Sequence, residues 1–425
     1  MSGIELAEKS LIGTMLKENY LIGDSGIRED FFDSRIHKNI FSGMKRLIAE
    51  NRPVDYITIM TIAEPSELGG ANYLADLRNF ASPVRFDEYR EIVVNAWKER
   101  EKGRVLQQAQ VEGWSIADIQ KTFDELQTEN TSELNTSIKD DLVELFEMPF
   151  QPTAIEPGVP AGLKDLDQML NGFQPSEMTI LAARPSMGKT DTLNHMALSA
   201  GWSGYLPIIF SLEMSRKLMI RRLIASSGGY NRLRMRDPYR YFDDKQKKDW
   251  PTSIGILGDA DIHIDDRSAL SVGQIKAQAR KIIHANPGKK PIIFIDYLQL
   301  IRPDNPRENS TQQIGQISYD LKGMAKEFGC PVICLSQLNR GVESRQDKRP
   351  LLSDLRDSGN IEQDADVVAF LYRDDYYDKE TENQNMLEII IAKHRNGPTG
   401  TVTVAYVKET GKLYDIDWNA RTSQS

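Results

Sequence analysis

A loop at residues 183–190, Ala-Arg-Pro-Ser-Met-Gly-Lys-Thr, holds residue types that bind phosphate. It follows an apolar strand-like run and opens a helix-like run. It matches the P-loop pattern G-x-x-x-x-G-K-[ST], except that Ala183 replaces the first glycine. Backbone N–H groups and the dipole at a helix start favour an anion there. Lys189 can reach the β- and γ-phosphates of a nucleotide, and the Thr190 hydroxyl can bind Mg²⁺. The loop therefore predicts nucleotide binding, with a chance Gly-Lys-Thr in a helix cap as the alternative.

Three polar residues follow other apolar runs and would lie at strand ends, where ligands bind in open α/β sheets. Asp296 is a candidate second ligand for Mg²⁺ beside the P-loop threonine. Glu213 is a candidate general base that activates water, although a solvated glutamate opening a helix gives the same pattern. Gln337 could hydrogen-bond the γ-phosphate or position the attacking water, but a polar residue at a strand end is usually part of a turn.

Two basic residues near the C-terminus, Lys393 and Arg395, precede a Gly-Pro turn. If the strand runs through Arg395, the alternation of side chains places both on one face and His394 on the other. Two cations aimed together suit stabilisation of the charge on a transferred phosphoryl group, in the same chain or on a neighbour's nucleotide. An ordinary solvated strand end is the alternative.

A turn at residues 358–360, Ser-Gly-Asn, offers backbone N–H groups beside Arg356. Backbone amides with one arginine can hold a phosphodiester strand without reading its bases. Residues 302–360 contain nine Lys and Arg against eight Asp and Glu. Charge alone therefore does not predict nucleic-acid binding at this turn.

Strand-like apolar runs alternate with helix-like segments from about residue 158. The runs are unbroken, as in Ile-Ile-Phe-Ile at 292–295, which is typical of strands covered on both faces. The pattern predicts an α/β domain with a mainly parallel sheet and helices on both faces. The expected strands are 178–182, 206–211, 291–295, 332–336, 367–372, 386–393 and 402–407.

Residues 4–125 have apolar side chains at helical spacing and are predicted to be mostly helical. Within them, 84–127 should form a long helical pair that breaks near 113–115. Residues 128–137 are polar, as linkers are. Residues 138–146 then form a short amphipathic segment that docks either on its own domain or on a neighbouring subunit, and the spacing alone does not separate these two.

The bulk properties fit an ordinary soluble globular protein of at least two domains. A net charge of −9 argues against coating duplex DNA through overall charge, but not against a local basic channel. Cys330 and Cys334 lie in an apolar run and are expected to pack in a core rather than to bind metal. The N-terminus lacks a signal-peptide pattern and no apolar run approaches the length of a membrane span. A cytoplasmic protein without membrane contacts is therefore predicted.

Taken in order, these motifs resemble the DnaB-type replicative DNA helicases of bacteria and phages. The resemblance covers essentially the whole chain and includes the P-loop with its alanine. It also includes residues 210–215, 295–300, 336–340, 354–359, 362–366 and 393–400 in the second half, and 7–13, 53–55 and 69–74 in the first half.

The resemblance implies a hexameric ring of chains that each hold a RecA-like P-loop ATPase domain at 158–425. An all-α collar domain at 1–127 precedes it, and the linker at 128–157 carries a helix that docks on the neighbouring subunit. ATP and Mg²⁺ would bind at subunit interfaces, and single-stranded DNA would thread the central channel. Hydrolysis would drive 5′-to-3′ movement and unwinding of duplex DNA at the replication fork. Primase and a helicase loader are further implied partners, through the N-terminal and linker regions.

Carried over residue by residue, the resemblance assigns Glu213 as the catalytic base and Gln337 as the γ-phosphate sensor. Lys393 and Arg395 are expected to reach the nucleotide of the adjacent subunit, Arg395 as the arginine finger. The implied Mg²⁺ ligands are Thr190 and Asp296. The implied nucleotide-binding residues are Ala183, Arg184, Pro185, Ser186, Met187, Gly188, Lys189, Thr190, Asp191 and Arg222.

Some segments depart from the family pattern or are not explained by it. Asp191-Thr-Leu-Asn replaces more apolar residues after the P-loop, so the start of that helix is expected to pack differently. Residues 228–249, rich in Arg, Lys and Tyr, are expected to form a solvated loop, with a contact to DNA, a loader or a neighbour as the alternative. The implied DNA-binding residues are Arg356, Asp357 and Gly359, where Asp357 replaces the commoner glutamate.

Two other functions share parts of this pattern. A RecA-like recombinase or regulatory ATPase would share the P-loop and the sheet, but not the helical N-terminal domain. A catalytically inactive ring subunit that loads DNA is opposed by the intact Lys189, Glu213, Asp296 and Arg395. The motor interpretation is therefore the main prediction.

Overall fold

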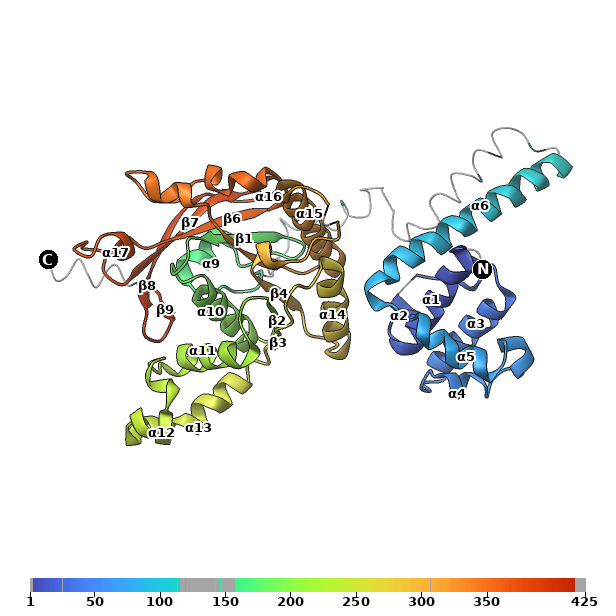
Figure 1. Ribbon diagram of the computed structural model, residues 1–425, viewed down its shortest axis with the longest axis horizontal. Coiled ribbons are helices and arrows are strands. Elements are labelled where there is room, and N and C mark those ends of the chain that lie inside the picture. The colour runs from blue at the N-terminus through green and yellow to red at the C-terminus, as the bar shows by residue number, and fades with distance from the viewer. Residues whose placement is uncertain are drawn as a thin grey trace. The chain divides into compact units, whose positions relative to one another are not determined.

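The chain divides into two compact units, Met1–Ala154 and Ile155–Ser425, in the computed structural model drawn in Figure 1. The structure describes residues 3–112 except 25, residues 157–416 except 306, and a few isolated positions between 114 and 146. Of residues 356–359 it describes the backbone only. The predicted docking helix at 138–146, the second helix of the 84–127 pair and nearly all of the 128–157 linker lie outside the described residues.

The described part of the N-terminal unit is helical, as the apolar spacing predicts. Ile40, Met44 and Leu47 line one side of a helix and are fully buried. The longest described helix runs from Phe86 to Glu112, and the predicted break at 113–115 lies almost wholly outside the described residues. The helices are α1 (Gly3–Lys17), α2 (Leu21–Asp24), α3 (Arg35–Ala49), α4 (Tyr56–Ile59), α5 (Ala71–Leu77) and α6 (Phe86–Glu112), joined in part by 3₁₀ turns at Glu29–Phe31, Pro65–Leu68, Arg78–Phe80 and Pro83–Arg85.

A buried polar network joins α1, α3 and α5. The carboxylate of Glu8 lies 2.5 Å from His37 Nδ1 and accepts hydrogen bonds from the backbone N–H groups of Asp33 and Ser34. His37 Nε2 lies 2.6 Å from the hydroxyl of Tyr73. Burial alone would raise the pKa of Glu8, but the hydrogen bonds from His37 and Asp33 outweigh it and hold the pKa below its ordinary value. The network explains why Glu8 and Tyr73 occur in the N-terminal motifs noted above.

Replacing Glu8 by alanine should destabilise this unit by about 3 kcal/mol, because the buried His37 and two partly buried backbone N–H groups lose their acceptor. Hydrogen–deuterium exchange of the full chain measures the effect. Peptides from α1 and α3 should exchange faster, whereas peptides from the second unit should not change. Glu91→Ala, on an exposed part of α6, is the control. Equal exchange in Glu8→Ala and wild type would contradict the prediction.

The second unit is built on a nine-stranded sheet with the order β3-β2-β4-β5-β1-β6-β7-β8-β9. Neighbours from β3 to β6 are parallel, and the pairs from β6 to β9 are antiparallel. The strands are β1 (Met178–Ala183), β2 (Leu206–Ser211), β3 (His263–Asp265), β4 (Pro291–Asp296), β5 (Val332–Gln337), β6 (Val367–Tyr372), β7 (Met386–His394), β8 (Gly400–Val407) and β9 (Lys412–Tyr414).

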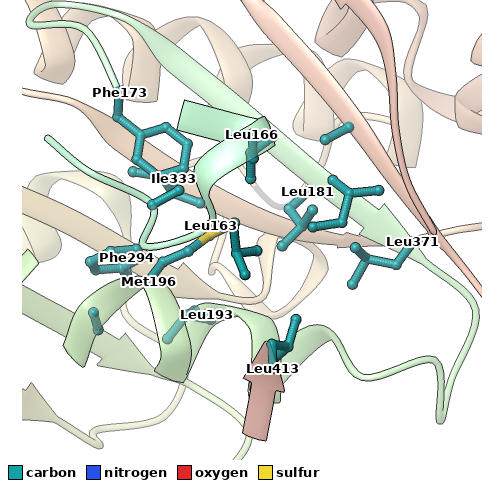
Figure 2. Packing of buried hydrophobic residues seen from close by; sticks show 14 of the residues in the cluster. Leu163, Leu166, Phe173, Leu181, Leu193, Met196, Phe294, Ile333, Leu371 and Leu413 are labelled. Carbon is teal, nitrogen blue, oxygen red and sulfur yellow. The ribbon is translucent and has the colours of Figure 1, made fainter. Parts of the chain in front are cut away.

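Apolar cores lie on both faces of this sheet, which confirms the predicted α/β fold. Along β1, Leu181 and Ala183 belong to one core, and Ile180 and Ala182 to the other, as strand alternation requires. The first face is covered by α9 (Lys164–Leu170) and α10 (Lys189–Trp202), and the second by α14 (Val272–Ala285) and α15 (Ser310–Phe328). Figure 2 shows part of the first core, including Leu163, Leu166, Leu181, Leu193, Met196, Phe294 and Ile333.

The segment 228–249 is partly helical, so the loop expected from its composition is wrong, whereas most of its charged side chains are exposed as expected. It contains the end of α11 (Arg216–Gly228), a 3₁₀ turn at Arg234–Arg236, α12 (Pro238–Tyr241) and the start of α13 (Asp244–Gly258). The aromatic rings of Tyr230, Phe242 and Trp250 pack against one another at centroid distances of 5.0–5.5 Å. These rings, Met235 and residues of α11 form a small core of their own. The helices α11, α12 and α13 lie together beside the sheet in Figure 1. Packing of these buried aromatic rings stabilises the segment. The many charged residues between them make this pattern hard to recognise in the sequence.

Both cysteines, Cys330 and Cys334, are buried and free, as predicted. Among the described residues, no cluster of His, Cys, Asp and Glu could hold a metal by itself. Within the same part of the chain, no helix is both long and apolar enough to cross a bilayer.

Candidate nucleotide-binding site

The P-loop connects the end of β1 to the first residue of α10, Lys189. Ala183 is the last residue of β1, paired in register with Gln337 of β5 and fully buried. An extended strand position does not require glycine, which explains why alanine is accepted there. Gly188, by contrast, has φ = 99° and lies against the Tyr406 ring, so a side chain at this position would be strained.

The loop borders a cavity of about 550 Å³ at the carboxyl ends of the parallel strands, where open α/β sheets bind ligands. Ala183 and Met187 of the predicted nucleotide-binding set do not line it, because both pack in the core. Arg184 lines a different, smaller cavity. The lining residues are Pro185, Ser186, Gly188, Lys189, Thr190, Asp191, Glu213, Met214, Arg222, Arg232, Gln337, Arg373, Tyr406 and Lys408.

Lys189 is one of several cations that line this cavity. Its Nζ donates a hydrogen bond of 3.2 Å to the carbonyl oxygen of Ser336 and lies 5.2 Å from the centre of the Tyr297 ring. Burial lowers the pKa of Lys189 to about 8, although the carboxylates of Asp296 and Glu213 oppose the shift. A phosphate in the cavity would favour the charged ammonium.

The affinity for ATP should therefore fall as the pH rises above about 8. The free protein loses the Lys189 proton near this pH, whereas bound phosphates keep the ammonium charged to higher pH. The affinity for ATP is therefore highest below pH 8, where free Lys189 is already protonated. It decreases by up to about ten-fold for each pH unit above 8. Titration with a fluorescent ATP analogue between about pH 7 and pH 9.5 measures this. Lys189→Arg, whose guanidinium stays protonated, should lose the pH dependence. A flat wild-type profile would contradict the prediction.

Thr190 and Asp296, the two predicted Mg²⁺ ligands, lie together. The Thr190 hydroxyl donates a hydrogen bond of 3.0 Å to Asp296 Oδ2. Asp296 ends β4 and is 1% exposed. Burial raises the pKa of Asp296, and the hydrogen bond from Thr190 counteracts only part of the increase. A hydroxyl and a carboxylate oxygen fit Mg²⁺, which is usually held by one or two side chains together with substrate phosphates.

Glu213 and Arg222 line the same cavity, as the sequence predicts. Glu213 follows β2, has an exposed side chain, and contributes to the raised pKa of Asp296 through its negative charge. Arg222 lies on α11, with Nη1 3.9 Å from Asp191 Oδ1. Both side chains are free of the sheet core, so they can move toward a bound nucleotide.

Gln337 borders two cavities. It lines the 550 Å³ cavity beside the P-loop, called the phosphate cavity below. It also lines a second cavity of about 380 Å³, together with Arg184, Asn339 and Arg340. The side chain of Gln299 holds its backbone: Gln299 Oε1 accepts from the Gln337 N–H at 3.2 Å, and Gln299 Nε2 donates to the Gln337 carbonyl at 3.3 Å. Gln299 lies within the motif at 295–300, but the sequence assigned it no role, because its contact depends on how the turn after β4 packs against the end of β5.

Lys393 and Arg395 do not line the cavity of their own chain. Arg395 Nη1 donates a 3.0 Å hydrogen bond to Asp366 Oδ1, and its side chain is half exposed. Lys393 Nζ donates to the carbonyl oxygen of Ala365 at 2.7 Å, at the end of α16 (Gly359–Asp364). Both side chains donate to the carbonyl oxygen of Gln363 and so lie on one side, although β7 ends at His394 and does not run through Arg395 as the alternation assumed. Their action on an adjacent subunit's nucleotide stays a prediction.

The residues predicted to bind DNA lie in one short helical stretch. Arg356 and Asp357 belong to a 3₁₀ segment at Leu352–Ser358, and Gly359 begins α16. The preceding residues Asp354 and Leu355 line the 380 Å³ cavity. Their role on DNA stays a prediction.

Arg373, Tyr406 and Lys408 line the phosphate cavity although no motif indicated them. The guanidinium of Arg373 lies 5.0 Å from the centre of the Tyr406 ring and donates to the Ser186 carbonyl oxygen at 3.2 Å. Asp375 accepts hydrogen bonds from Arg373 and pairs with Lys408. Arg373 directly follows β6 and Lys408 follows β8, so the strand-end signal used for Glu213 and Asp296 would have found both.

A P-loop between β1 and α10, with a buried acid at the end of β4 in a mainly parallel sheet, defines a RecA-like P-loop ATPase. The family model described as "DnaB-like helicase C terminal domain" matches residues 158–415. The model described as "DnaB-like helicase N terminal domain" matches residues 4–95. The chain belongs to the DnaB-like helicase family. The resemblance drawn from the sequence motifs is thereby confirmed.

Relatives and solved structures extend this match over nearly the full length. The chain is 37% identical to "Replicative DNA helicase DnaC" of Bacillus subtilis (strain 168), covering 97% of this chain and 94% of that protein. It is also 37% identical to "Replicative DNA helicase DnaB" of Geobacillus stearothermophilus, with the same coverage. "The Structure Of A DnaB-Like Replicative Helicase And Its Interactions With Primase" matches with a TM-score of 0.65 and 38% identity over 97% of this chain and all of the other. A second solved structure, of an ATPase domain, matches with a TM-score of 0.64 and 44% identity over 66% of this chain and 99% of the other.

Proposed function

We propose that this chain is a replicative DNA helicase: a subunit of a hexameric ring that couples ATP hydrolysis to 5′-to-3′ movement on single-stranded DNA and to unwinding of duplex DNA at the replication fork. The observation that carries the proposal is the cavity lined by Lys189, Thr190 and Glu213, with the buried Asp296 hydrogen-bonded to Thr190 at its wall. Family membership over both units supports it, because a recombinase or a regulatory ATPase would not need the helical N-terminal unit.

Each cavity residue has a proposed task. Lys189 and the N–H groups at the start of α10 bind the β- and γ-phosphates. Thr190 and Asp296 hold Mg²⁺, which when bound neutralises charge on the phosphates. Glu213 accepts a proton from the attacking water, and Gln337 contacts the γ-phosphate. Arg222 adds a second cation to the phosphates.

The remaining tasks belong to neighbouring molecules. Lys393 and Arg395 complete the site of the adjacent subunit, and the stretch with Arg356, Asp357 and Gly359 holds the backbone of single-stranded DNA. Primase is a proposed partner, by analogy with the relative solved for its interactions with primase. A loader acting on the N-terminal and linker regions is also proposed, as is a cytoplasmic location.

Unwinding assays on forked duplexes test this function. Wild type should unwind, with ATP and Mg²⁺, a fork on which it encircles the strand with a free 5′ tail, and Lys189→Ala should reduce the rate to background. A fork with only a 3′ tail is the polarity control. The proposal fails if wild type shows no ATP-dependent unwinding even when a relative's loader is supplied. Equal activity of wild type and Lys189→Ala would also overturn it, since the P-loop would then not drive the motion.

A further inference from the structure

The departure of Asp191 from the family pattern has a structural counterpart in Arg232. Arg232 Nη1 donates a hydrogen bond of 3.0 Å to Asp191 Oδ2, and Nη2 pairs with the other carboxylate oxygen. The Tyr406 hydroxyl donates to Asp191 Oδ2 at 2.5 Å. Asp191 itself is 4% exposed and follows Thr190 directly. A buried carboxylate on the wall of the phosphate cavity is thus matched by one bidentate arginine.

The backbone of the turn between β8 and β9 leaves room for the Arg232 side chain to contact Asp191. The N–H of Arg232 donates to the carbonyl oxygen of Glu409 at 2.9 Å, which ties it to the turn between β8 and β9. In that turn, Gly411 has φ = 77°, and a Cβ there would overlap Arg232 Nη2 and lie 3.0 Å from the Asp191 side chain. Only glycine at position 411 leaves room for the Arg232 side chain to reach Asp191, so the ion pair depends on Gly411 as well as on Arg232.

The negative charge of Asp191 matters because of where it lies. Triphosphate binds at the start of α10, and an unmatched carboxylate in its first turn would repel it. Arg222 also lies 3.9 Å from Asp191, with its side chain 32% exposed on the cavity wall. If Asp191 lacked Arg232, Arg222 would be its remaining cationic neighbour in the cavity and would be drawn away from the phosphates.

We propose that Arg232 is a positioning residue of the ATP site, which neutralises Asp191 and so leaves Arg222 and the P-loop available to the triphosphate. The inference rests on the proposed ATPase function. It assigns to Arg232 a role through Asp191 rather than a direct contact with the nucleotide. The signature of this role is that the effect of losing Arg232 should disappear when the charge of Asp191 is removed as well.

The test is a double-mutant cycle with side chains of similar size: Arg232→Gln, Asp191→Asn and both together. Arg232→Gln should raise the KM for ATP and the dissociation constant of a fluorescent ADP analogue about ten-fold, mainly through binding rather than kcat. Asp191→Asn is the second single variant of the cycle, and adding Arg232→Gln to it should change the KM and the dissociation constant by no more than about three-fold. Arg234→Gln, an exposed arginine two residues away, is the control.

Thermal unfolding of each variant shows whether it is folded under assay conditions. If Arg232→Gln is not, Arg232→Lys replaces it, with a smaller increase in KM expected because the charge remains but the bidentate geometry is lost. Wild-type affinity in Arg232→Gln would overturn the inference, and so would an effect of Arg232→Gln that is as large in the Asp191→Asn background as in wild type. A wild-type chain that binds no ATP would instead overturn the proposed function, so the two failures are distinguishable.

Discussion

Replacing Arg395 by alanine should lower the kcat for ATP hydrolysis by about 10³-fold or more, with little change in the affinity for ATP. An arginine supplied by a neighbour stabilises the charge of the transition state, and its loss affects the chemical step rather than binding. In its own chain Arg395 pairs with Asp366 and does not line the cavity that holds Lys189. Single-turnover hydrolysis and binding of a fluorescent ADP analogue measure the two quantities. His394→Ala, the preceding residue, is the control.

Mixing two inactive variants tests whether the arginine acts across subunits. Lys189→Ala rings and Arg395→Ala rings should each be inactive. After random reassembly, about a quarter of the interfaces join an intact Lys189 to an intact Arg395 from the neighbour. Hydrolysis should therefore recover to a clearly measurable fraction of the wild-type rate. Absence of recovery, with subunit exchange verified by mass spectrometry, would falsify the shared site.

Glu213→Gln should lower kcat by about 10²- to 10⁴-fold while ATP still binds. The amide keeps the size of the side chain but cannot accept the proton of the attacking water. Glu213 is exposed and lies outside the sheet core, so the free energy of unfolding should not change. Quench-flow measurement of the first turnover tests the chemical step directly. Glu380→Gln, an exposed glutamate away from the cavity, is the matched control. A first turnover as fast as that of wild type would assign the base to another group.

Much of the ATPase fold follows from local sequence patterns. The apolar runs at 206–211 and 367–372 coincide with β2 and β6, because strands buried on both faces need a continuous apolar stretch. The short strands β3 and β9 were not predicted. His263–Asp265 is only partly buried, and Lys412–Tyr414 alternates, so neither has such a stretch. Their pairing depends on neighbours that are distant in sequence.

The site shows the same division. Lys189, Thr190 and Asp296 could be predicted because strand and helix ends fix where they lie. The pairing of Asp191 with Arg232 could not, because it joins residues 41 positions apart through a turn in a third segment. Arg184 lies inside the P-loop motif, yet its side chain donates to Glu343 and to the Leu338 carbonyl oxygen, away from the phosphate cavity. A motif locates a backbone path, whereas side-chain directions depend on packing.

The position of Gln337 between two cavities has a thermodynamic consequence. Both cavities are lined by the same residue, whose N–H and carbonyl oxygen are both hydrogen-bonded to the side chain of Gln299. If a ligand in one cavity changes the affinity for a ligand in the other, that coupling is reciprocal. Whatever factor an occupant of the 380 Å³ cavity applies to ATP affinity, ATP applies the same factor to that occupant. One coupling free energy therefore describes the effect of each ligand on the affinity for the other. A substitution at Gln299 that changed this free energy would change both effects by the same factor.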